Sequence, residues 1–135
     1  MSITKELKYL AMASLFGKMF SKDRSTQVGA FFMHPTEYTL LATGYNGLPR
    51  GCDDEKPERH ERPLKYEFFE HAECNAIYNC VREQFRGCTL RVSERMQAND
   101  IRALISVGTA TVHTTRPIES DTGRALLAEA GVSVV

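Results

Sequence analysis

The sequence lacks three features, and each absence excludes a class of function. It has no net charge, because 17 basic side chains balance 17 acidic ones. It therefore has no general positive field to attract polymeric nucleic acid or a membrane surface. No apolar run approaches the roughly 20 residues of a membrane span, and the opening stretch MSITKELKYL has no signal-peptide core. We expect a cytoplasmic protein with no membrane partner and no polymeric nucleic-acid partner.

A third absence concerns cysteine spacing. The four cysteines are Cys52, Cys74, Cys80 and Cys88; none form a C-x-x-C pair, and no cysteine follows Cys88. With no export signal, these thiols are expected to be reduced. Cys80 and Cys88 are expected to be small core residues. The commonest zinc-binding cysteine motif is therefore excluded.

The apolar pattern predicts an initial helix and hairpin, followed by alternating helices and strands. Residues 3 to about 20 repeat apolar side chains at helical spacing, and 28–33 and 38–46 are β-prone segments joined by a short turn. Residues 47–63 are a long charged loop with three prolines. The remaining elements are a helix from about 66 or 71 to 83, a strand at 88–93, a helix at 99–108 capped by Asn99 and stopped by Gly108, a strand at 109–115, a helix at 121–131 and a strand at 132–135.

This order of elements predicts the fold class. A chain of 135 residues is long enough for one core and too short for two, so residues 1–135 are expected to form a single domain. Strands that alternate with helices after a hairpin predict a five-stranded mixed sheet with helices on both faces, a three-layer α/β/α fold.

One short stretch, HAECNAIYNC at 71–80, carries the chemistry. In zinc deaminases, a His at the position of His71 binds the metal and a Glu at the position of Glu73 moves protons. Two cysteines, spaced C-x-x-C further along the chain, complete that metal site. Here the first half of the pattern is present without the second.

The chain resembles the deoxycytidylate (dCMP) deaminases of the cytidine-deaminase superfamily. The resemblance implies a cytidine-deaminase-like fold, hydrolysis of dCMP to dUMP and ammonia by zinc-activated water, and a homo-oligomer. It covers nearly the whole chain and is carried by SKDRSTQVGA (21–30), TGYNGLPRGCDD (43–54), KYEFFEHAECNAIYN (65–79), GCTLRVS with RALISVG (87–93 and 102–108), and LLAEAGVSVV (126–135).

The chain departs from this family where the P-C-x-x-C motif should stand. Aligned through RALISVG, the two cysteine positions fall on Gln97 and Asp100, within MQAND. Gln97 is a poor zinc ligand, and His71 with Asp100 supplies only two of the three protein ligands that a catalytic zinc normally has. Cys74, three residues after His71, is a weak further candidate. Without a metal, Asp100 is expected to pair directly with His71.

The resemblance also implies a set of nucleotide-binding residues in the two loops around the substrate and near the helix. Asn46 resembles the family residue that contacts sugar and base, and the basic side chains are candidates for phosphate. Arg24 is a departure, since proline is common there in the family. The full set is Lys22, Arg24, Asn46, Arg50, Tyr66 and His71.

Three functions remain open. The first is a protein that binds a pyrimidine deoxynucleotide without a cofactor, having lost zinc hydrolysis, with Glu73 left for any metal-free step. The second is an active dCMP deaminase with zinc in an unusual site built from His71, Cys74 and Asp100. The third is an interaction module or non-catalytic subunit, paired with an active paralogue.

Overall fold

The computed structural model describes residues 3–93 and 96–135, and the strands among them form one mixed sheet. The strand order is β2-β1-β3-β4-β5, with β1 antiparallel to β2 and β3, and β4 parallel to β3 and β5. The predicted hairpin and five-stranded sheet are confirmed. The strands are β1 (Gly29–Met33), β2 (Leu40–Tyr45), β3 (Thr89–Val92), β4 (Thr111–Thr114) and β5 (Ser133–Val134).

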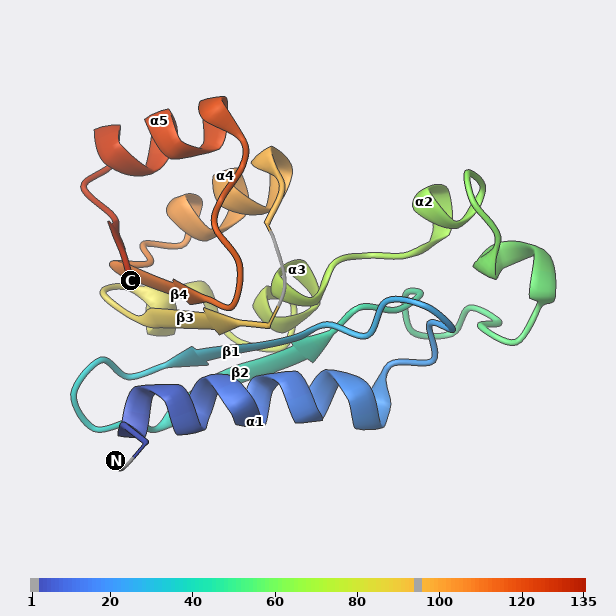
Figure 1. The fold of residues 1–135 in the computed structure, drawn as a ribbon, viewed down its shortest axis with the longest axis horizontal. Coiled ribbons are helices and arrows are strands. Elements are labelled where there is room, and N and C mark those ends of the chain that lie inside the picture. Colours follow the sequence, from blue (N-terminus) through green and yellow to red (C-terminus); the bar gives the residue numbers. More distant parts are fainter. Residues whose placement is uncertain (1–2, 94–95) are drawn as a thin grey trace.

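Helices cover both faces of the sheet, as the sequence predicted (Figure 1). One face carries α1 (Lys5–Phe20), and the other carries α3 (Ala72–Ile77), α4 (Ala98–Ser106) and α5 (Asp121–Glu129). The strand β1 is buried along its whole length because apolar layers lie on both sides of it. Phe31 packs in the cluster beneath α1, while Phe32 packs in the larger cluster beneath the other helices.

Two glycines let α1 lie directly on β1. A Cβ atom at Gly29 would stand 1.8 Å from the carbonyl oxygen of Ala13, and one at Gly17 would stand 2.4 Å from the Gly29 nitrogen. Only glycine tolerates so close an approach of two backbones. The helix α1 begins after Thr4, whose side chain accepts a hydrogen bond from the Leu7 N–H, close to the predicted start.

The predicted helix from about 66 or 71 to 83 is wrong in its extent. The chain forms α2 (Lys65–Phe68), then α3, then the 3-10 turn η2 (Arg82–Phe85). Glu70 leaves the helical conformation because its backbone pairs with Gly47 in an isolated β-bridge. His71 is extended and serves as the N-cap of α3. Tertiary pairing has therefore overridden the helical periodicity of this segment.

The predicted helix at 99–108 starts slightly earlier than expected. Its N-cap is Gln97 rather than Asn99, because Gln97 and Asp100 form a reciprocal capping box. Gly108 follows the helix with a positive φ of 90°, as the stop signal predicted.

The long loop after β2 contains one 3-10 turn, η1 (Pro57–His60), and reaches away from the sheet together with α2 (Figure 1). Cys88 is buried, while Cys80 is half-buried against the edge of the core. All four cysteines are free thiols. Within residues 3–93 and 96–135, every helix is too short or too polar to cross a membrane.

Candidate functional site

The start of α3 is fixed in place by β2 and the loop that follows it. Gly44 lies against α3 so closely that a Cβ atom there would stand 2.4 Å from the Ala72 oxygen and from the Ala76 nitrogen. Gly47 and Glu70 exchange two backbone hydrogen bonds, at 3.1 and 2.9 Å. His71 and Glu73 are therefore held at the end of the sheet by backbone contacts on both sides.

His71 and Asp100 form a direct pair across the start of two helices. The imidazole Nδ1 of His71 lies 2.7 Å from Oδ1 and 2.9 Å from Oδ2 of Asp100. Asp100 is buried and also accepts the backbone N–H of Gln97 at 3.0 Å, which fixes its carboxylate. The hydrogen bond to Asp100 raises the pKa of His71, although burial opposes it. The expected contact between Asp100 and His71 is confirmed.

Glu73 is a buried carboxyl beside this pair. Only 3% of it is exposed. Burial, followed by the negative charge of Asp100, raises the pKa of Glu73 to about 8. At neutral pH the Glu73 carboxyl is therefore mostly protonated and can donate a proton. A carboxyl with so high a pKa is typical of a group that acts as an acid or base.

Two other positions near His71 are candidates for metal ligands, Cys74 and Gln97. Cys74 is half-buried, and burial raises the pKa of its thiol to about 12. Gln97 is exposed and its side chain caps α4. No three His, Cys, Asp or Glu side chains of residues 3–93 and 96–135 are arranged to hold a metal ion.

The basic candidates for phosphate lie at the surface. Lys22 and Arg24 are exposed on the loop that joins α1 to β1, and Lys22 Nζ is 3.5 Å from Asp54 Oδ1. Arg50 is exposed and donates a hydrogen bond of 2.9 Å to Asn79 Oδ1. Tyr66, 65% exposed, lies on α2. The three cations thus come from the two predicted loops, while Tyr66 comes from the short helix α2.

Asn46 is buried, and its side chain is already engaged within the protein. Its Nδ2 donates to Asp23 Oδ2 at 3.0 Å and to the Thr26 carbonyl at 2.7 Å. Its Oδ1 accepts the Val28 N–H at 2.8 Å. Both amide hydrogens are used, so in this conformation Asn46 joins two loops and has only acceptor capacity left for a ligand.

Asp23 and Lys65 are two further buried charges near the site, and the sequence did not predict them. Lys65 Nζ lies 2.8 Å from Asp23 Oδ1, with 5% and 1% of the two side chains exposed. Asp23 sits among small polar residues, a pattern typical of a side chain that caps its own turn. No local signal identifies Lys65, which is 42 residues further along the chain, as its partner.

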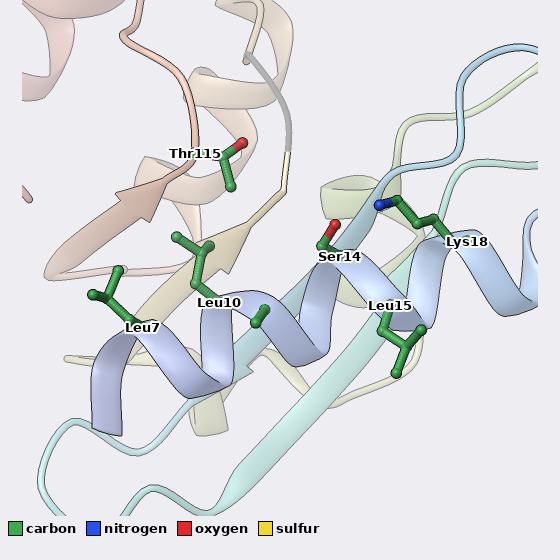
Figure 2. A pocket seen from close by; sticks show the side chains of 7 residues that line it. Leu7, Leu10, Ser14, Leu15, Lys18 and Thr115 are labelled. Carbon is green, nitrogen blue, oxygen red and sulfur yellow. The ribbon is translucent and has the colours of Figure 1, made fainter. Parts of the chain in front are cut away.

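Two cavities lie away from His71 and Glu73. A groove of about 430 Å³ runs along α1, where Leu7 and Leu10 lie on the side of the helix toward Thr115 and Leu15 points away from it (Figure 2). This groove is on the sheet face opposite α3. A second cavity of about 560 Å³ lies against β2 and is lined in part by Arg50 and Asn79. The candidate site is therefore assigned by its chemistry and by its contacts, and not by the size of a cavity.

Known proteins resemble this chain along part or all of its length. It is 34% identical over 91 residues to the deoxycytidylate deaminase of Mus musculus and 32% identical to that of Homo sapiens. In both cases the match covers 64% of this chain and 51% of the relative. The chain thus spans about half the length of these curated relatives.

Solved structures extend the comparison to the whole fold. The dCMP deaminase from the cyanophage S-TIM5 in apo form has a TM-score of 0.76 and 25% identity, with 99% of this chain and 98% of that one covered. The same enzyme in complex with dCMP and dUMP gives a TM-score of 0.73. Acinetobacter baumannii RibD, at 18% identity and a TM-score of 0.65, shares the fold.

A family model settles the membership of the chain. The model described as the cytidine and deoxycytidylate deaminase zinc-binding region matches residues 3–116, most of the sequence. The matched region includes the H-x-E of α3 and the position of Gln97 and Asp100. The chain therefore belongs to the cytidine and deoxycytidylate deaminase family.

Proposed function

We propose that this protein binds a pyrimidine deoxynucleoside monophosphate and no longer performs zinc-dependent deamination. The observation that carries the proposal is the contact between His71 Nδ1 and both carboxylate oxygens of Asp100. Aligned with the family motif, Asp100 stands where the second zinc-binding cysteine would be. The imidazole nitrogen nearest to that position is thus already paired with a carboxylate.

The chemistry of the remaining donors supports the same conclusion. A catalytic zinc site normally holds the metal with three protein ligands and keeps the fourth position for water. Here the aligned positions offer a neutral amide at Gln97 and a carboxylate at Asp100, with a single imidazole at His71. This donor set does not fit a catalytic zinc ion.

Binding of a nucleotide is supported by the loops around the site. The structurally similar dCMP deaminase from the cyanophage S-TIM5 was solved in complex with dCMP and dUMP. In this chain the exposed cations Lys22, Arg24 and Arg50 lie in the loops that match the family. Exposed cations suit a phosphate, because a charge-assisted hydrogen bond is about twice as strong as a neutral one.

Glu73 is the residue left for chemistry. Its protonated carboxyl can give a proton to a ring nitrogen of a bound base, and its pKa of about 8 allows the proton to return near neutral pH. Proton transfer alone does not remove the amino group of the base, because a strong nucleophile must also attack the ring carbon that carries it. The expected result is nucleotide binding with negligible deamination.

The test combines calorimetry with metal analysis of protein purified without a chelator. We expect dCMP to bind, zinc to stay well below one ion per chain, and dUMP production to be negligible. The double variant Gln97→Cys with Asp100→Cys should gain zinc, since His71 supplies the third ligand; the matched variant Gln97→Ser with Asp100→Ser should not.

Two other outcomes identify the alternative functions. Stoichiometric zinc that is lost in His71→Ala, together with dUMP production, would establish an active deaminase with an unusual metal site. Absence of both zinc and nucleotide binding would leave a non-catalytic subunit, whose partner would be an active paralogue. Co-purification with a second deaminase chain would then be the measurement.

A further inference from the structure

Asp23 lies at the centre of a buried network. Its Oδ1 accepts hydrogen bonds from Lys65 Nζ at 2.8 Å, from the Ser25 N–H at 3.0 Å and from the Thr26 N–H at 3.2 Å. Its Oδ2 accepts the Asn46 amide at 3.0 Å. Burial raises the pKa of Asp23, but hydrogen bonds from Lys65, Ser25 and Thr26 outweigh it, and the pKa lies below its ordinary value. The carboxyl is ionised at neutral pH.

Lys65 provides the balancing charge from a different part of the chain. It opens α2, is 4% exposed, and also donates to Ser25 Oγ at 2.8 Å. Removing two charges from water costs about as much as their attraction returns, so a buried pair rarely adds net stability over apolar residues. We therefore look for the role of the pair in holding the two loop segments that it joins in a fixed arrangement.

The contacts around the pair form a closed ring. Asp23 joins Asn46 through its side chain, and the next residue, Gly47, pairs with Glu70 through the backbone. Glu70 directly precedes His71 and lies five residues after Lys65, which returns to Asp23. The ring thus ties the loop that carries Lys22 and Arg24 to the segment that carries His71.

We propose that Asp23 and Lys65 are positioning residues for the nucleotide's 5′-phosphate. Asp23 stands between Lys22 and Arg24 in the sequence, and its ion pair with Lys65 fixes the backbone from which both cations extend. The pair itself does not touch the ligand. This inference rests on the proposed function, and it specifies that the phosphate, more than the base, depends on the buried pair.

The experiment compares binding of dCMP with binding of deoxycytidine, which lacks the phosphate. The dissociation constant of deoxycytidine divided by that of dCMP isolates the contribution of the phosphate. The main variant is the double substitution Asp23→Asn with Lys65→Met, which removes both charges together. It retains one oxygen for the Ser25 and Thr26 N–H groups and gives up the acceptor of the Asn46 amide. It therefore avoids leaving one charge buried and unpaired. The control for general destabilisation is Leu127→Ala, which leaves a cavity beneath α5 without touching Asp23 or Lys65.

We expect the ratio to fall by roughly tenfold or more in the double variant, the loss of one charge-assisted hydrogen bond to phosphate. Affinity for deoxycytidine should change less than affinity for dCMP, and Leu127→Ala should keep the ratio of the unaltered protein. A double variant that folds and keeps that ratio would overturn the positioning role. Failure of the unaltered protein to bind dCMP at millimolar concentration would instead overturn the proposed function, and this inference with it.

Discussion

A single residue, Glu73, is expected to lower the stability of the protein at neutral pH. The pKa of its carboxyl is about 8 in the folded protein and about 4.5 in the unfolded chain. A raised pKa gives stability that is fully present below about 4.5 and lost as the pH rises toward 8. The cost at pH 7 is at most about 3.5 kcal/mol, because pH 7 lies about 2.5 units above the unfolded pKa and each unit corresponds to about 1.4 kcal/mol.

Glu73→Gln should therefore raise the free energy of unfolding. The amide is close in shape and cannot ionise, so the gain should be absent near pH 4, grow above it and level off above pH 8. Urea unfolding at several pH values measures it. A variant no more stable than the unaltered protein at pH 8 would contradict this prediction. It would show that folding does not raise the pKa of Glu73.

A second residue-scale prediction concerns His113, on the other face of the sheet. Arg91 Nη1 lies 2.6 Å from His113 Nδ1, so the ring is neutral and accepts this hydrogen bond. Burial, followed by the charge of Arg91, lowers the pKa of His113, while Glu6 on α1 raises it slightly. A lowered pKa gives stability that is present above about 6.5 and lost as the pH falls through the folded value.

His113→Gln should weaken this acid sensitivity. The Gln side chain keeps an acceptor for Arg91 and cannot be protonated, so its stability should decline less than that of the unaltered protein between pH 7 and pH 5. Thermal unfolding across that range gives the comparison. Equal losses in both proteins would show that His113 does not titrate with folding.

At the scale of elements, the sequence predicted the existence of helices and strands better than their limits. Alternating or helical periodicity located α1, the hairpin and α5, because these elements depend on which face is buried. It failed between Lys65 and Phe85, where one helix was expected and two short helices and a turn are found. The interruption is caused by the backbone pairing of Glu70 with Gly47, a contact that no local pattern contains.

The contact between β2 and α3 gives a prediction at the same scale. In Gly44→Ala the new methyl group would meet backbone atoms of Ala72 and Ala76 at 2.4 Å. Backbone cannot rotate aside as a side chain can, so α3 must shift and take His71 and Glu73 with it. We expect a loss of roughly 1–3 kcal/mol in stability and a weaker affinity for dCMP.

Gly47→Ala is the matched control for this test. A Cβ atom there would come no closer than 4.0 Å to any atom, and that nearest atom belongs to the Tyr45 side chain. Chemical denaturation and dCMP titration of both variants decide the matter. If the two variants behave alike, the close packing of α3 on β2 is not what holds the site.

For the whole molecule, the three-layer fold was predictable because each element buries a recognisable apolar face. The candidate site was predictable only in part. The pairing of His71 with Asp100 followed from the missing cysteines, since two oppositely charged groups would be left in one space. The network of Asp23 and Lys65 was not predictable, because it depends on how distant loops meet after the sheet has formed.

The last prediction concerns assembly. Several apolar side chains of α1 remain in contact with water, among them Leu7, Leu15 and Met19 at 49%, 56% and 67% exposure. Each would gain free energy from burial, at about 25 cal/mol for every Å² removed from water. A second copy of the chain offers a matching apolar surface, and we expect a homodimer or larger oligomer formed through this helix.

Light scattering should then give a mass at least twice that of the 15.2 kDa chain at micromolar concentration. Leu15→Glu should shift the protein to the monomer, because a charge in an apolar interface loses its hydration. Leu64→Glu, at a similarly exposed leucine near α2, should leave the mass unchanged. A monomer for the unaltered chain would contradict the prediction, and a mass unaffected by Leu15→Glu would place the contact on another face.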